Sequence, residues 1–375
     1  MIFPSWGKLS LGEDMKKLLL RTAAILVAAV LFIGPVGAVS AQRAIVLDAA
    51  TGRVLYERNA DEQSLIASTT KIMTALIVCQ QCNVLDRVKI PKEAVGVEGS
   101  SMYLREGEVL TVQELLYGLM LRSGNDAAAA LAIWCGGTIE GFAERMNDKA
   151  RELGLENTHF VNPHGLDAPD HYSTARDLAA LTAYAMNDPI FARTVGAKTV
   201  TVGERVLTNH NKLLWQLQGC EGVKTGYTKA AGRILVSSAS RQGRRLICVT
   251  INAPDDWNDH KALLEEGFSG YQVRELVAEG EVLGYRHILG GDGTHVPLVA
   301  AEGFSYALAE GEEVEIVLSP QYFSYAPVTA GAPEGCAYAV LNGQVIGQIE
   351  LVWGTSLDET QEKERTLLER LFGGI

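Results

Sequence analysis

The sequence predicts an α/β domain with an antiparallel sheet flanked by helices, followed by a small all-β domain. Strand-like segments stand at both ends of region 42–274, and helical patterns fill its middle. From about residue 275 the chain changes to short alternating segments separated by Gly, Asn and Pro. The 375 residues, 47% of them hydrophobic, are enough for two cores. We therefore expect one domain over 42–274 and a second over 275–353.

The N-terminal residues have the pattern of a secretory signal peptide over 15–41. A positive stretch from Met15 to Arg21 precedes an apolar run over 22–33, and small residues ending at Ala41 suit cleavage before Gln42. Residues 1–14 then read as an over-extended start. A retained anchor is the alternative, although the apolar run is shorter than the ~20 residues of a spanning helix. We expect an exported protein at the cell wall or the outer face of the cytoplasmic membrane.

The first domain is expected to begin with a hairpin and then become helical. Strands over 44–47 and 53–57 flank an Ala-Thr-Gly turn, and a helical pattern occupies 64–78. Short strands and loops follow over 84–110. Thr111 and Glu114 form a capping-box signature before a helix over 112–121. Further helices are predicted over 127–134, 139–153 and 173–187, the last capped by Ser173 or Thr174, then strands over 233–240 and 244–252 and a helix over 259–273.

The second domain is expected to be a β structure, most simply a sandwich. Its strands are predicted over 275–284, 295–298, 312–318, 337–341 and 344–353, with a hairpin turn at Asn342-Gly343. The tail over 354–375 has an amphipathic helical pattern with more acids than bases. We expect it to be solvated or to associate weakly with a membrane.

Charge and cysteine content limit the possible partners and cofactors. The net charge of −12 argues against nucleic acid as a partner. Among the six cysteines, Cys79 and Cys82 are the only close pair. Buried thiols are the simplest reading, a disulfide or redox pair remains open, and zinc would need two further ligands. We expect no metal and no cofactor.

Ser68 and Lys71 are candidates for a nucleophile and its base. Residues three apart share one face of a helix, so the hydroxyl and the amine can meet. An amine kept neutral by burial or by a second cation can accept the hydroxyl proton. Alone the pattern is weak, because Ser5 and Lys8 show the same spacing and a serine of this kind is usually an N-cap.

Two further triplets supply groups that such a nucleophile needs. Ser123 at a helix break can carry a proton, and the Asn125 amide can hold both the lysine and a substrate amide. Lys224 can keep Lys71 neutral and attract a carboxylate, which Thr225 can also bind. Gly226 lets a substrate backbone approach the strand closely.

The order Ser-x-x-Lys, Ser-x-Asn, Lys-Thr-Gly resembles the serine-type D-alanyl-D-alanine carboxypeptidases of the S11 family, which are low-molecular-mass penicillin-binding proteins. The resemblance covers about 42–274 and extends to the segments 66–75, 121–128, 162–166, 172–177, 208–211 and 222–228. It implies a transpeptidase/β-lactamase-like fold, and the β-rich segment after it resembles the second domain of the family.

The resemblance also implies roles and partners. Ser68 would attack the penultimate D-alanine of a peptidoglycan stem peptide with Lys71 as base, and Ser123 would protonate the leaving D-alanine. The oxyanion would lie between the N–H groups of Ser68 and Tyr227, and Arg245 would bind the substrate carboxylate. Penicillins and other β-lactams would acylate Ser68 by the same route.

Two other function classes remain open. A β-lactamase shares these motifs, but no Glu-x-x-x-Asn loop for deacylation is found. A non-catalytic penicillin- or peptidoglycan-binding protein would not need all of the catalytic side chains. A histidine base is disfavoured because His164 lies in a Pro-Gly turn, and Asp126 is expected to serve its helix N-terminus.

Overall fold

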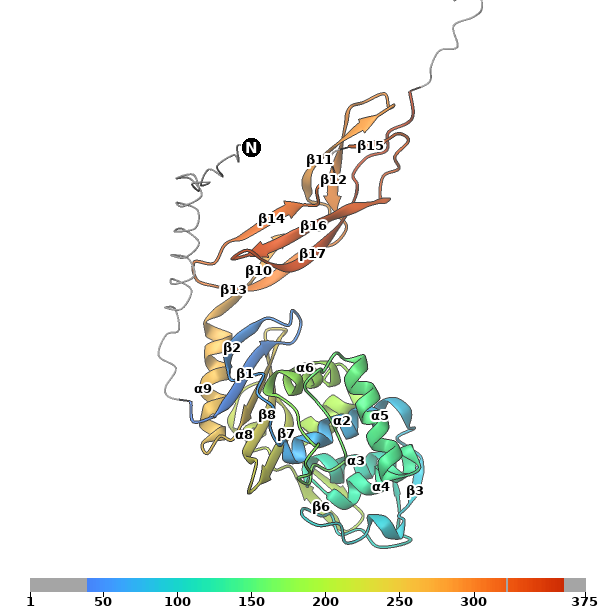
Figure 1. Cartoon of the computed structure of the whole chain (residues 1–375), viewed down its shortest axis with the longest axis vertical. Helices are drawn as coiled ribbons and strands as arrows, with labels where there is room; N and C mark the ends of the chain where they lie inside the picture. The colour runs from blue at the N-terminus through green and yellow to red at the C-terminus, as the bar shows by residue number, and fades with distance from the viewer. Residues whose placement is uncertain (1–38, 322, 361–375) are drawn as a thin grey trace, which may run out of the picture.

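The structure is a computed structural model that describes residues 39–321 and 323–360 (Figure 1). In Figure 1 a domain of helices packed on a sheet lies below an elongated β domain. Most of the expected signal peptide, the expected over-extended start and residues 361–375 of the expected tail lie outside the described residues. The prediction of a helix in the tail is wrong for the described residues 356–360, where Leu357 and Glu359 form β-bridges with Val328 and Gly291. Within those residues no helix is both long and apolar enough to cross a membrane.

The first domain is built on a five-stranded antiparallel sheet with strand order β2-β1-β9-β8-β7. The predicted N-terminal hairpin is confirmed, and its first strand pairs with the last strand of the domain, so the two ends of the domain meet at the centre of the sheet. The strands are β1 (Arg43–Asp48), β2 (Val54–Arg58), β7 (Cys220–Thr228), β8 (Gly232–Arg241) and β9 (Arg244–Ile251).

Helices cover both faces of this sheet because its strands alternate their side chains between two cores. Ile45 and Val249 face a large core shared with α2–α7, whereas Val46 and Cys248 face a smaller core with α8 and α9. The helices are α2 (Lys71–Gln81), α3 (Val112–Leu121), α4 (Asn125–Gly136), α5 (Ile139–Glu152), α6 (Ala175–Ala185), α7 (Pro189–Gly196), α8 (Leu213–Gln216) and α9 (Asp256–Ser269), with 3-10 turns η1 (Ala67–Thr70) and η2 (Lys92–Ala94).

Local capping signals place several of these helices. The capping box of α3 is confirmed, since the Thr111 hydroxyl accepts from the Glu114 N–H and the Glu114 carboxylate accepts from the Thr111 N–H. Thr174 caps α6. The sequence prediction missed α7, although Asp188 caps it and Pro189 opens it. It also missed the hairpin of β5 (Thr199–Val202) and β6 (Arg205–Thr208); a second small hairpin joins β3 (Arg87–Lys89) to β4 (Val109–Thr111).

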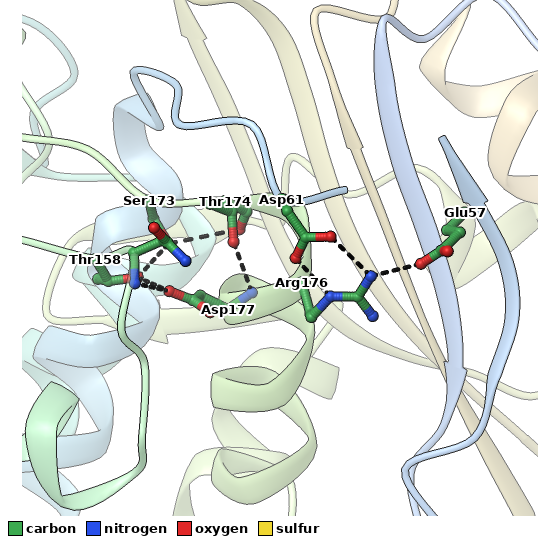
Figure 2. A network of polar contacts seen from close by, with 8 residues as sticks. Glu57, Asp61, Thr158, Ser173, Thr174, Arg176 and Asp177 are labelled. Atoms are coloured by element: carbon green, nitrogen blue, oxygen red, sulfur yellow. Dashed lines mark hydrogen bonds and ion pairs between the residues drawn. The ribbon is translucent and has the colours of Figure 1, made fainter. Parts of the chain in front are cut away.

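A polar network ties the start of α6 to the sheet and to the preceding loop (Figure 2). Arg176 binds Asp61 at 2.6 Å and Glu57, at the end of β2, at 2.5 Å. At the next residue, the Asp177 carboxylate accepts from the Thr158 hydroxyl at 2.7 Å. The network therefore holds the segment that leads into η1, since Ser173 also pairs with Ser64 just before that turn.

The second domain is all-β, as predicted, and has two sheets. A two-stranded ribbon of β10 (Tyr271–Val277) and β13 (Phe304–Ala309) packs on a six-stranded sheet through side chains such as Val277, Leu308 and Leu341. The turn at Asn342-Gly343 is confirmed between the last two strands. The larger sheet contains β14 (Val314–Leu318), β16 (Pro333–Leu341), β17 (Gln344–Trp353), β12 (His295–Ala300), β11 (Val282–Leu289) and β15 (Phe323–Tyr325), in that order.

Two structural features bear on the expected boundaries of the first domain. Helix α9 ends at Ser269 and β10 begins at Tyr271, so the helix predicted to reach residue 273 was too long. At the other end, Val39 and Ala41 are buried and Ser40 binds Asp259 of α9. Cleavage before Gln42 stays a prediction, and it would remove the contacts that Val39 and Ser40 make with the first domain.

Arg53, in the turn between β1 and β2, joins the two domains. Its guanidinium binds Glu312 with two hydrogen bonds of 2.6 and 2.8 Å and also donates to the Ala307 carbonyl. It lies over the rings of Tyr271 and Tyr306, at 4.9 and 5.2 Å from their centroids. A bidentate ion pair combined with aromatic stacking fixes this junction more firmly than a single surface ion pair would.

Candidate active site

Ser68 lies in the 3-10 turn that leads directly into α2. The expected helix over 64–78 is therefore two elements, η1 and then α2, and the first residue of α2 is Lys71. Ala67, the residue before the serine, has a φ of 45°. A positive φ is unfavourable for alanine and is found mainly where the surrounding structure enforces it, often at functional sites. The turn is thus held in one conformation with Ser68 at its tip.

Lys71 is fully buried, and its amine lies between three oxygen atoms. Nζ is 3.0 Å from Ser68 Oγ, 2.7 Å from Asn125 Oδ1 and 2.5 Å from the backbone carbonyl of His164. A neutral amine can donate two hydrogens and accept one. It can therefore donate to the amide and the carbonyl while its lone pair accepts the serine proton. The geometry of this site suits a neutral lysine.

Electrostatics favour the same protonation state. Burial, and then the positive charge of Lys224, hold the pKa of Lys71 well below its usual value, with a smaller opposing effect from Asp126. Burial also lowers the pKa of Lys224 to about 7. Two adjacent buried ammonium groups repel each other, so the pair readily gives up a proton near neutral pH.

The second motif lies at the break between α3 and α4. Ser123 is buried with a φ of 60°, and Asn125 begins α4. The Asn125 amide donates to the Glu98 carbonyl at 2.5 Å, which fixes which of its atoms faces Lys71. Asp126 is structural, as expected: its carboxylate accepts from Ser101 and from the N–H groups of the loop at Met102 and Leu104.

The third motif lies within β7, not at the start of a strand, and it passes close to the nucleophile turn. Lys224 is almost fully buried and donates to the Thr225 carbonyl at 2.7 Å. A Cβ on Gly226 would lie 3.4 Å from the Ser68 nitrogen and 3.3 Å from the Ile66 carbonyl. This tight approach brings the backbone after Gly226, at Tyr227, beside the backbone of Ser68.

Sequence reasoning missed the contribution of loop 162–166. Its His164 carbonyl is a partner of Lys71, and Gly165 packs so closely that a Cβ there would lie 1.8 Å from the Ala67 carbonyl. His171 supports the same turn: its Nδ1 accepts from Val161, so Nε2 carries the hydrogen and donates to Thr70 at 2.7 Å. Burial lowers the pKa of His171 to about 4 and that of His164 to about 3, so both are neutral.

Most of the expected residues meet in one cleft of about 310 Å³. The described residues that line it include Ser68, Ser123, Thr225, Gly226 and Tyr227, together with Ser100, His210, Arg233, Asp256 and Trp257. Lys71, Asn125 and Lys224 lie behind this surface. Tyr227 also lines the cleft and is 65% exposed.

Arg245 lies apart from this group. Its guanidinium binds Glu221 at 2.8 Å and the Met186 carbonyl, and it does not line the cleft. Arg233 does line the cleft: it pairs with Asp256 at 2.7 Å and leaves its buried Nε without a partner. Arg233 stands directly opposite Tyr227 across the β7–β8 hairpin. The structure therefore does not place Arg245 in the lining of the cleft, and its role as the carboxylate partner stays a prediction.

Comparison with known proteins identifies related families and proteins for both domains. Residues 32–255 match the D-alanyl-D-alanine carboxypeptidase family of S11 peptidases, and residues 271–359 match the C-terminal domain of penicillin-binding protein 5. The chain is 32% identical to D-alanyl-D-alanine carboxypeptidase DacF of Bacillus subtilis, over 82% of this chain and 83% of that protein. It is 35% identical to DacC of Escherichia coli, over 86% of this chain and 85% of that protein.

Solved structures agree in fold. Penicillin-binding protein 5 of Haemophilus influenzae superimposes with a TM-score of 0.76 at 30% identity, covering 87% of this chain and all of that one. The match includes both domains, so the helix-flanked antiparallel sheet and the following β domain form the two-domain architecture of that protein. The chain belongs to the S11 family of D-alanyl-D-alanine carboxypeptidases.

Proposed function

We propose that Ser68 is the nucleophile of this D-alanyl-D-alanine carboxypeptidase and that Lys71 is its general base. The observation that carries the proposal is the position of Lys71 Nζ, 3.0 Å from Ser68 Oγ and buried beside a second lysine. Burial and like charge keep the amine neutral at the pH at which the hydroxyl must lose its proton.

In the first half-reaction, Ser68 Oγ attacks the carbonyl carbon of the penultimate D-alanine, and its proton passes to Lys71. The oxyanion accepts hydrogen bonds from the N–H groups of Ser68 and Tyr227, which the close packing at Gly226 supports. The peptide bond then breaks. The terminal D-alanine leaves as its amine takes the proton from Lys71 through Ser123, which lines the cleft.

In the second half-reaction, water replaces the departed D-alanine. Lys71 accepts a proton from the water as it attacks the ester carbonyl, and the proton returns to Ser68 when the ester bond breaks. The enzyme is restored and the peptide ends in the new carboxylate. Penicillin would form the same ester with Ser68, since its lactam carbonyl resembles the peptide carbonyl that the site receives.

The carboxylate of the terminal D-alanine is assigned to Thr225 and Arg233. Both line the cleft, and Lys224 adds positive charge beneath them. Arg233 pairs with Asp256 at the cleft itself, whereas Arg245 pairs with Glu221 outside the cleft lining. Arginine binds a carboxylate with directed N–H groups, which would fix the C-terminal end of the substrate.

The natural substrate is proposed to be the stem peptide of peptidoglycan, and the site of action to be the cell wall outside the cytoplasmic membrane. Residues 15–41 are proposed to direct export. The tail over 354–375 is proposed to associate at most weakly with a membrane. Equal partition between vesicles and buffer of the mature chain and a chain ending at Trp353 would exclude that association.

Mass spectrometry of the protein mixed with diacetyl-Lys-D-Ala-D-Ala, and separately with penicillin, tests the function. The expected result is release of one D-alanine and a penicilloyl adduct on the Ser68 peptide that is absent in Ser68→Ala. Rapid penicillin turnover without D-alanine release would indicate a β-lactamase. Neither release nor adduct would indicate a binding protein.

A further inference from the structure

Two cysteines that are far apart in the sequence meet at the ends of two catalytic helices. Cys82 directly follows α2, and Cys135 lies in the last turn of α4. Both are partly exposed, and each thiol is close enough to perturb the pKa of the other. The Gln81 side chain lies beside them: its oxygen accepts from the Cys135 thiol at 3.7 Å and from Arg145 at 2.9 Å.

The surroundings make one thiol of this pair reactive. The hydrogen bond from Cys82 and then the positive charge of Arg145 lower the pKa of Cys135 to about 7, while the pKa of Cys82 is raised by the same hydrogen bond and by burial. Of the two thiols, Cys135 is therefore the one that gives up its proton more readily. Thiolates attack disulfides, so Cys135 is suited to be the attacking sulfur and Cys82 the resolving one.

Of the remaining cysteines, Cys79, Cys220 and Cys248 lack this environment, and Cys336 lies in β16 of the second domain. Cys79, the apparent partner of Cys82 in the sequence, points into the core of the first domain, and burial raises its pKa to about 12. Cys248 is fully buried in β9, and burial raises the pKa of Cys220 to about 11. The two cysteines that are close in space, Cys82 and Cys135, are thus not the two that are close in the sequence, Cys79 and Cys82.

We propose that Cys82 and Cys135 form a disulfide that joins the C-terminal ends of α2 and α4. The Cys135 thiolate attacks one sulfur of an external disulfide, either a small-molecule disulfide or that of a thiol–disulfide oxidoreductase, and releases one thiolate. The Cys82 thiol then loses its proton and attacks the Cys135 sulfur of the mixed disulfide, releasing the second thiolate. The two cysteines are oxidised, and the external disulfide is reduced to two thiols.

The bridge would act on the catalytic site through the helices. Lys71 is the first residue of α2 and Asn125 is the first residue of α4, and their side chains are 2.7 Å apart. The contact between the base and its amide partner is made at one end of the helix pair, and the bridge closes the other end. A covalent link there stabilises the fold by restricting the unfolded chain over 82–135.

The test is to incubate the full mature chain with oxidised glutathione at pH 7.5 and to measure its mass and its peptides without reduction. The expected result is a mass lower by about 2 Da, from the two hydrogens lost on closure, with a linkage between segments 72–87 and 123–145. Because Cys79 shares the first peptide, the matched variants are Cys79→Ser, which should still form the bridge, and Cys82→Ser, which should not.

Thermal unfolding gives a second readout that does not depend on catalytic activity. We expect the oxidised parent and the oxidised Cys79→Ser variant to melt about 5–10 °C above their reduced forms. Cys82→Ser and Cys135→Ser should melt at the same temperature in oxidant and in reductant. The proposal is overturned if both thiols stay free in oxidised glutathione or if the linkage found joins Cys79 to Cys82.

Discussion

The two domains differ in what they bury. The first encloses Lys71 and Lys224 at 0% and 1% exposure, with amides, hydroxyls and carboxylates packed around them. In the described part of the second domain the buried side chains are apolar, apart from Arg286. Burying a charged group costs folding free energy unless it is paired. The first domain therefore accepts this loss of stability where the chemistry is done, whereas in the described part of the second domain the cost is limited to Arg286, which lies 3.6 Å from Glu334.

The largest expected effect comes from removing the nucleophile. Ser68→Ala should lower D-alanine release by about 10⁴-fold or more, because loss of a nucleophile removes the covalent route entirely. Steady-state release from the tripeptide measures this effect, with an unchanged melting temperature as the control for folding. Retention of a tenth of the activity would mean that another group attacks the substrate.

Lys224→Met removes one of the two buried amines of the first domain. It tests whether the charge of Lys224 supports catalysis although its burial lowers the free energy of unfolding. We expect activity to fall by roughly 10²–10³-fold. Without the Lys224 charge the pKa of Lys71 rises, and since the neutral amine is the active form, the acid limb of the kcat/KM profile should move to higher pH. A profile measured from pH 5 to 10 checks the direction.

The same variant should be more stable than the parent. The pKa of Lys224 is about 7 in the folded state, below its ordinary value of 10.5. The penalty of burying it is therefore complete below pH 7 and disappears as the pH rises toward 10.5. We expect Lys224→Met to add on the order of 2 kcal/mol to the free energy of unfolding at pH 7 and little at pH 10. Denaturant unfolding at both pH values measures it; equal gains would contradict this origin.

Arg233 and Arg245 form a matched pair within the first domain. Arg233→Ala should lower kcat/KM for the tripeptide by about 10–100-fold, the range expected for a lost charge-assisted hydrogen bond to a carboxylate. Arg245→Ala should change kcat/KM less than about threefold, since Arg245 binds Glu221 and lies outside the cleft. With a substrate whose terminal carboxyl is amidated, the two variants should no longer differ in kcat/KM, because there is no carboxylate for either arginine to bind. The reverse ranking would restore Arg245 as the carboxylate partner.

The smallest effect on activity is expected at the junction of the domains. Arg53→Ala removes the ion pair with Glu312 and the stacking on Tyr271, so the melting temperature should fall by a few degrees. Hydrolysis of the soluble tripeptide should stay within about twofold, because every residue assigned to the site belongs to the first domain. A tenfold loss would show that the junction controls the cleft.

Much of the fold was predictable because local signals agreed with the tertiary structure. The capping box at Thr111, the hairpin at Asn342-Gly343 and the paired strands after residue 232 all carry their information within a few residues. The predicted end of α9 was wrong because its apolar pattern continues into β10, where Val273 and its neighbours serve a strand. The spacing of apolar residues alone does not show that the helix ends and a strand begins on the two sides of Gly270.

The motif residues could be predicted, but their partners could not. The contact between Lys71 and His164 uses a backbone carbonyl. Every residue type has this group, so the sequence cannot indicate the contact. The position of Arg233 does have a signal: it lies across a short connection from Tyr227, so pairing the strands at Lys224 and Arg233 would have placed it at the cleft. The proximity of Cys82 and Cys135 depends on how α2 packs on α4, which no spacing encodes.

The contact of His164 with the base also bears on how the enzyme tolerates mutation. Lys71 is held by the carbonyl of His164, which every amino acid supplies, whereas Gly165 has a φ of 87° and no room for a side chain. A saturation library should accept many residues at 164 and almost none at 165, although only 164 touches the lysine. Sequence variation at that position would thus understate its importance, and an inhibitor that exploits this carbonyl would contact an atom that no substitution can delete.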